Sequence, residues 1–182
     1  HISRLAHEVG ALHWVDGVHA TAHASVDIVA LDADVWTCSP YKFMGPHCGV
    51  LAASPDLLET LHPDKLLPST NDVPERFEFG TLPYEALAGA TAAVDFIAGL
   101  AESSEDDDTA SGTRRERIEA SMKAVHAHER ALLDVLEPAL RGLPGVTVHS
   151  NAAKRTPTLL FTVEGRDPQE IRGLLAERGV NA

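Results

Sequence analysis

The chain has 182 residues, of which 44% are hydrophobic, so it can form one large domain, or one domain and part of another. Its formal net charge of −12 opposes attraction to phosphate backbones and anionic lipids, which makes nucleic acids and membrane surfaces poor candidates as partners. It has only two cysteines, no signal peptide and no stretch near the roughly 20 consecutive apolar residues of a membrane span, so we expect a cytoplasmic protein with reduced thiols.

The N-terminal half alternates between helical and apolar segments. After a first helix, residues 12–16 form an apolar run that ends in a carboxylate, which is typical of a buried parallel strand. Residues 34–39 are rich in β-branched and aromatic side chains and predict a second strand, and 49–53 is close enough to return beside it. Ser54 then caps a helix whose first residue is Pro55. This alternation predicts an α/β sheet.

The middle of the chain combines a loop, two helices and a charged segment. Residues 66–79 hold prolines and a polar stretch, which predict a long loop, and a helix of small residues that could be buried on most sides then ends near Gly99. The acidic residues of 102–113 predict a solvated linker. Apolar side chains at helical spacing over 114–140 predict a long amphipathic helix whose end Pro138 should disturb.

The C-terminal segment predicts two strands, at 143–149 and 156–163, followed by a helix that Asp167 caps and Pro168 opens. The last residues resemble the first step of a further strand, and the first residues already form a helix. We therefore expect an internal fragment, or the ordered part, of a longer polypeptide.

Three segments carry residues suited to one kind of chemistry: 16–19 at the end of one strand, 39–46 at the end of the next, and 77–81 after the long loop. Residues at adjacent strand ends converge in open α/β sheets. Pyridoxal phosphate (PLP) chemistry needs a lysine amine for a Schiff base, an acid at the pyridine nitrogen, and donors for the phosphate. These segments contain all three kinds of group.

The same segments resemble the class V aminotransferases of PLP fold type I, in their cysteine desulfurase-like branch. The resemblance covers most of residues 3–180 and is strongest in ValAspGlyValHis, SerProTyrLysPheMetGlyProHisCysGly and PheGluPheGlyThr. It implies an α/β fold like that of aspartate aminotransferase. Residues 1–101 would be the C-terminal part of the large PLP-binding domain, 114–142 an interdomain helix, and 143–182 an incomplete, small α+β C-terminal domain.

The resemblance also implies a role for each matching residue in binding pyridoxal 5'-phosphate. Asp16 would pair with the pyridinium nitrogen, and His19 would lie near the phenolic oxygen. Ser39 and Tyr41 would contact the phosphate. Lys42 would hold the cofactor as a Schiff base and then act as general acid and base on the substrate.

Thr81 would reach the phosphate of the cofactor in a neighbouring subunit, which implies a homodimer with shared sites. The implied substrate is an amino acid that undergoes C–S or C–Se cleavage, or related lyase or epimerase chemistry. Desulfurases of this group commonly have Gln where this chain has His19, and His where it has Tyr41, so the substrate stays open. The sulfur-accepting cysteine and the substrate-carboxylate arginine would lie near or beyond Ala182, so this part alone would be inactive.

Other interpretations remain open at this point. The fold could serve as a non-catalytic scaffold or binding subunit. The ten histidines raise the question of a zinc site, but pairs such as His126 and His128 do not share a helix face and lack a third ligand at suitable spacing. Cys48 could accept sulfur or be a buried structural thiol, and Arg155 could bind a substrate carboxylate or lie at the surface at a strand start.

Overall fold

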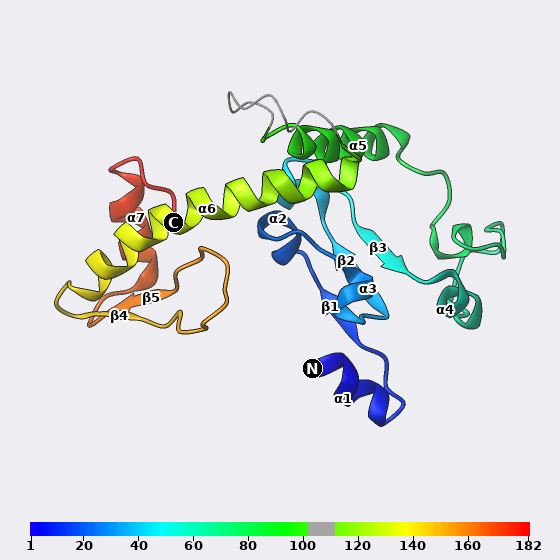
Figure 1. Ribbon diagram of the computed structural model, residues 1–182, viewed down its shortest axis with the longest axis horizontal. Coiled ribbons are helices and arrows are strands. Elements are labelled where there is room, and N and C mark those ends of the chain that lie inside the picture. The colour runs from blue at the N-terminus through cyan, green and yellow to red at the C-terminus, as the bar shows by residue number, and fades with distance from the viewer. Residues whose placement is uncertain (102–111) are drawn as a thin grey trace. The chain divides into compact units, whose positions relative to one another are not determined.

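The computed structural model describes residues 1–101 and 112–182, so most of the expected acidic linker lies outside the described residues. The chain forms two compact units, His1–Ala124 and Val125–Ala182. Their boundary falls within one long helix, α6 (Arg114–Arg141) (Figure 1). No helix in the described ranges is both long and apolar enough to cross a membrane.

The first unit is built on a three-stranded sheet with β2 in the centre, as Figure 1 shows. Its strands are β1 (Trp14–Asp16), β2 (Val35–Cys38) and β3 (Val50–Ala53), and all three were predicted from apolar runs. β1 runs parallel to β2, with Asp16 opposite Thr37, and β3 is antiparallel to β2. The sheet is therefore mixed, and the carboxyl ends of β1 and β2 lie at the same edge.

Short helices connect these strands, and side-chain caps fix where two of them begin. Asp27 accepts a hydrogen bond from the Ala30 N–H at 2.9 Å, and Ser54 accepts one from the Leu57 N–H at 3.2 Å, the latter as predicted. The helical segments of this unit, apart from the first part of α6, are α1 (Ile2–Glu8), α2 (Ala20–His23), α3 (Ile28–Leu31), η1 (Pro40–Phe43), α4 (Pro55–Thr60), η2 (Glu75–Phe77) and α5 (Tyr84–Ala98).

The core of the first unit joins η1 to α5 and α6. Phe43, Ala93, Ile97 and Met122 form one buried cluster, with Cys38 among the half-buried side chains packed against it. Only one face of α5 takes part, because Tyr84 and Phe96 on this helix are 67% and 55% exposed. The prediction that this helix is buried on most sides is therefore wrong for the described residues.

The second unit contains the C-terminal part of α6, an antiparallel strand pair and a helix. The strands are β4 (Val146–Val148) and β5 (Phe161–Val163), and Asp167 caps α7 (Pro168–Ala176), as predicted. α6 continues through Pro138 to Arg141 without a break. The proline removes one backbone donor near the helix end, where few further turns depend on it.

Candidate functional site

Two of the three predicted segments meet at one edge of the sheet. Asp16 is the last residue of β1, and η1, which carries Lys42, begins one residue after Ser39 at the end of β2. Because β1 and β2 are parallel and in register, both segments leave the sheet in the same direction. α2, which follows Asp16 in the chain, contacts η1. The topology thus brings Asp16 and Lys42 to a common edge.

Asp16 is exposed and sits in a tight turn. Its Oδ1 accepts a hydrogen bond from the Val18 N–H at 3.0 Å, and the following N–H, of Gly17, donates to the Thr37 carbonyl at 2.8 Å. The second bond continues the pairing of β1 with β2 beyond the last strand residue. These two hydrogen bonds therefore fix the backbone on the C-terminal side of the exposed Asp16 carboxylate.

A buried tryptophan supports the same turn, and the sequence alone did not reveal it. The Trp36 Nε1–H donates to Thr21 Oγ1 at 3.1 Å, and that hydroxyl donates to the Gly17 carbonyl at 2.7 Å. A Cβ atom at Gly17 would lie 2.1 Å from the Trp36 ring, so only glycine fits here without a shift. The glycine next to the carboxylate was the one signal in the sequence that pointed to this close approach.

The lysine turn is held by packing on both sides of Lys42. Pro40 is fully buried and Phe43 lies in the core cluster, whereas Lys42 is exposed between them. After the turn, Met44 adopts a left-handed conformation with φ of 69°, and the Gly45 N–H bonds the Pro40 carbonyl at 2.8 Å. A Cβ at Gly45 would lie 2.8 Å from the Pro40 side chain, so glycine closes the turn.

One aromatic ring, that of Tyr41, lies next to the lysine amine. The Tyr41 ring stacks on the His47 imidazole, with centroids 5.0 Å apart and planes 9° apart. Lys42 Nζ lies 5.0 Å from the centroid of the Tyr41 ring, within the range of a cation–π contact. His47 was not singled out from the sequence, although it lies in the same quoted motif. The stack fixes the orientation of Tyr41 beside Lys42.

His19 and Ser39 flank these two turns. His19 is exposed at the start of α2, and its ring lies 4.7 Å from the ring of His23, one helical turn further on. Ser39 is half-buried in extended backbone and makes no side-chain capping bond to η1. Both residues belong to segments that leave the same sheet edge as Asp16 and Lys42.

The third predicted segment ends at Thr81, which is exposed in the loop that leads to α5. Gly80 before it has a φ of 138°, a conformation that side chains rarely adopt. The expected role of Thr81 concerns a cofactor in a second subunit, so it stays a prediction for this single chain.

The cysteines and histidines show no further reactive centre. Cys38 and Cys48 are both free and half-buried, and burial raises the pKa of the Cys38 thiol above its ordinary value. A raised pKa keeps a thiol protonated and weakly nucleophilic. Among residues 1–101 and 112–182, no group of three or more His, Cys, Asp or Glu side chains is placed to hold a metal ion.

Arg155, in the second unit, has a structural partner. Its Nη2 forms an ion pair with Glu137, which also accepts from Arg141 at 2.7 Å. Both arginines lower the pKa of the Glu137 carboxyl, Arg141 more strongly. Arg155 also donates to the Thr158 carbonyl at 3.5 Å, so its guanidinium ties the loop before β5 to α6. Arg155 is therefore neither at the surface nor at a strand start, because its side chain is only 15% exposed and β5 begins at Phe161.

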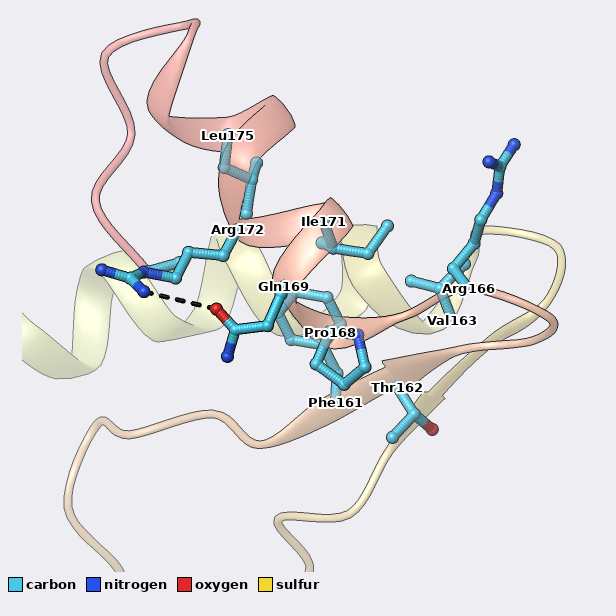
Figure 2. A pocket seen from close by; sticks show the side chains of 10 residues that line it. Phe161, Thr162, Val163, Arg166, Pro168, Gln169, Ile171, Arg172 and Leu175 are labelled. Atoms are coloured by element: carbon cyan, nitrogen blue, oxygen red, sulfur yellow. Dashed lines mark hydrogen bonds between the residues drawn. The ribbon is translucent and has the colours of Figure 1, made fainter.

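The second unit also has a hollow of about 260 Å³ between β5 and α7 (Figure 2). Its floor is apolar and includes Ile171 and Leu175. Arg172 donates to Gln169 Oε1 at 3.3 Å across one rim, and Arg166 pairs with Glu170 at 2.8 Å. Both arginines at this hollow therefore have partners, and none of the predicted site residues lines it.

The sequence matches the class-V aminotransferase family over residues 1–121. It is 30% identical to an uncharacterized protein of Mycobacterium tuberculosis over the whole chain, which spans 44% of that protein. It is 28% identical to a probable cysteine desulfurase of Streptomyces coelicolor, with 98% of this chain and 41% of that protein covered. The chain thus spans less than half the length of these relatives.

Solved structures show the same fold. A cysteine desulfurase from Thermococcus onnurineus aligns with a TM-score of 0.78 at 22% identity, covering 99% of this chain and 44% of that one. The cysteine desulfurase CsdA of Escherichia coli aligns with a TM-score of 0.74 at 24% identity, covering 98% and 42%. A C-DES mutant that carries glycine covalently linked to its PLP cofactor aligns with a TM-score of 0.64 at 20% identity, covering 89% and 41%. These neighbours have PLP fold type I, and the chain belongs to the PLP-dependent class-V aminotransferase family.

Proposed function

We propose that this chain is the lysine-bearing part of a PLP-dependent enzyme that acts on an amino acid, in the manner of the cysteine desulfurases it resembles. One observation carries the proposal. Lys42 is exposed on a turn whose neighbours Pro40 and Phe43 are buried, and this turn leaves the sheet at the same edge as the Asp16 carboxylate. An amine and a carboxylate on one rigid edge are the pair that the cofactor requires.

The donor set at this edge fits PLP. When bound, PLP supplies an electron sink for bonds at the substrate's α carbon. The Asp16 carboxylate would hold a proton at the pyridine nitrogen, because an adjacent negative charge favours the protonated form. The hydroxyls of Ser39 and Tyr41 would bind phosphate oxygens, and His19 would lie near the phenolic oxygen. Lys42 would bind the cofactor covalently and then move protons to and from the substrate.

Tyr41 lies beside the lysine amine, since Lys42 Nζ is 5.0 Å from the centroid of its ring. The Tyr41 ring also stacks on His47, and this contact would hold the ring in place while its hydroxyl binds the phosphate.

The names of the relatives favour C–S cleavage as the reaction of the whole protein. C–Se cleavage, or related lyase or epimerase chemistry, stays open from the sequence resemblance. We place the enzyme in the cytoplasm on the sequence features alone. Thr81 would complete the site of a second subunit in a homodimer. Bound cofactor without turnover of any amino acid would instead identify a PLP-fold scaffold or binding subunit.

The test is the visible absorption band of lysine-bound cofactor after PLP is added to the full-length protein. Lys42→Ala should abolish the band, while Lys123→Ala, an exposed lysine on α6, should leave it unchanged. Cysteine, selenocysteine and kynurenine would then be compared for release of sulfide, selenide or alanine. A band that persists in Lys42→Ala would refute the assignment of the lysine.

A further inference from the structure

We propose that a second site in the first unit binds a small oxyanion, such as phosphate or a carboxylate group. The site is a pocket of about 320 Å³ in the segment between α4 and η2, which begins at the end of α4 in Figure 1. A volume at the low end of the ligand-pocket range suits a small molecule or a single anionic group. The pocket is lined by His62, Pro63, Lys65, Asn71 and Arg76.

The side chains that line this pocket favour an anion as its ligand. It contains two cationic side chains, a histidine and an amide, and no carboxylate, although the chain as a whole carries a net charge of −12. Like charges on facing walls repel each other unless an anion lies between them. A cation would meet only positive charge here, and an apolar molecule would leave the polar groups without partners.

Arg76 is held in place by three hydrogen bonds. Its Nη2 pairs with Glu59 Oε2 at 2.6 Å, and its Nη1 donates to the carbonyls of Glu59 and Leu61 at 3.5 and 3.4 Å. The side chain is 11% exposed, and its Nε is buried with no hydrogen-bond partner in the parts of the chain that the structure describes. The guanidinium is therefore fixed in the pocket wall, where its positive charge adds to that of Lys65.

Lys65 is fixed in a similar way. Its Nζ donates to the carbonyls of Ser69 and Thr70 at 2.7 and 2.6 Å, which ties the amine to the loop. An ammonium has three protons, so one remains for a ligand. Asn71, directly after Thr70, adds an amide to the same pocket. The loop therefore arranges its donors before any ligand arrives.

The nearby carboxylates do not cancel this arrangement. Glu59 is occupied by Arg76, and Asp72 accepts from the Thr70 hydroxyl at 3.1 Å. Asp64 and Glu75 lie in the same segment, but neither lines the pocket. None of these four carboxylates lines the pocket, so its lining stays cationic. This site shares no residue with the edge that carries Asp16 and Lys42.

The experiment measures binding of inorganic phosphate to the full-length protein by isothermal titration calorimetry. Saturating PLP is present, and chloride keeps the ionic strength constant. Lys65→Gln should weaken phosphate binding about tenfold or more, because it removes a charge-assisted hydrogen bond. Lys123→Gln removes an equal charge from an exposed position on α6, and it should leave the affinity for phosphate unchanged. Equal affinity in the parent protein and Lys65→Gln, or no saturable binding, would overturn the proposal.

Three further experiments sharpen the result. Arg76→Lys keeps the charge but cannot keep the guanidinium's bonds to Glu59 and Leu61, so it should also weaken binding, and circular dichroism would show that the variant is folded. Acetate in place of phosphate distinguishes a site for a carboxylate from a site for a tetrahedral anion. Crystals soaked in selenate should show anomalous density beside Arg76 and Lys65, and density only elsewhere would count against this pocket.

Discussion

The two turns that leave β1 and β2 lie at one edge of the sheet but are held by different interactions. The turn after Asp16 depends on hydrogen bonds that link Gly17, Thr21 and Trp36. The turn that carries Lys42 depends on apolar contacts of its neighbours, with few side-chain hydrogen bonds of its own. A carboxylate turn built from polar contacts and a lysine turn built from packing should respond to different substitutions.

The largest effect is expected at Phe43. Phe43→Ala would leave a cavity beside Ile97 and Met122 and should lower the free energy of unfolding by about 3 kcal/mol. Urea unfolding of the full-length protein, followed by circular dichroism, would measure this loss. Phe79→Ala removes an equal side chain that is 89% exposed, and it should change stability little. Similar losses in both variants would show that packing does not hold the lysine turn.

Gly17→Ala tests the other turn. The added Cβ would meet the Trp36 ring at 2.1 Å, so the backbone or the ring must move, and we expect a loss of about 2 kcal/mol. Gly49→Ala is the matched control, since nothing lies within 4 Å of a Cβ there. PLP affinity, measured by the visible band, should fall in Gly17→Ala because the carboxylate moves with the turn. Unchanged unfolding in Gly17→Ala would contradict the close approach.

Thr21→Val separates hydrogen bonding from shape. The variant keeps the volume but leaves the Trp36 Nε1–H without its acceptor, which should cost about 1 kcal/mol. Thr91→Val is its counterpart, because Thr91 also donates to a carbonyl four residues earlier, at 3.0 Å, but on an exposed helix face. We expect a near-neutral effect there. Equal unfolding free energies for the two variants would show that the hydrogen bonds of Thr21 do not stabilise the Asp16 turn.

The opposite edge of the sheet is held in part by charge, and pH should reveal it. His7 Nε2 lies 2.8 Å from Asp34 Oδ2, which also accepts from the His13 N–H at 2.6 Å. The hydrogen bond to Asp34 raises the pKa of His7 above its ordinary value of 6.5. The His13 N–H, and then His7, lower the pKa of Asp34 below its ordinary value of 3.8.

The directions of these two pKa shifts define a pH range in which both groups stabilise the fold. The contribution of His7 is complete below pH 6.5 and is lost as the pH rises through its raised pKa. That of Asp34 is complete above pH 3.8 and is lost as the pH falls through its lowered pKa. His7→Gln should therefore lower the urea midpoint slightly between these values and less at higher pH. The parent protein, measured over the same pH range, gives the reference profile, and an equal effect of His7→Gln at every pH would contradict the role of this pair.

The sequence predicted the parts of the site that depend on local patterns. The apolar runs located β1, β2 and β3, and the proline and glycine around Lys42 located its turn. These features depend on residues close in the chain, so a single sequence reveals them.

The contacts that form only when the chain folds back on itself were not predictable in this way. The approach of Trp36 to Gly17 depends on how two strands pair, and the stack of Tyr41 on His47 depends on how the lysine turn closes. The exposed face of α5 was missed because small and apolar residues alone do not reveal which face other elements cover. The continuation of α6 through Pro138 was missed because a proline near a helix end costs less than one in the middle.

The burial of Phe43 beside Lys42 links this lysine turn to two helices that lie far from it in the sequence. Phe43 contacts the cluster formed by Ala93 and Ile97 of α5 and Met122 of α6. Because a packed interior transmits changes in side-chain volume, a substitution at any of these positions would disturb Phe43 and, with it, the turn that carries Lys42. Helix residues can therefore adjust the lysine turn without belonging to it.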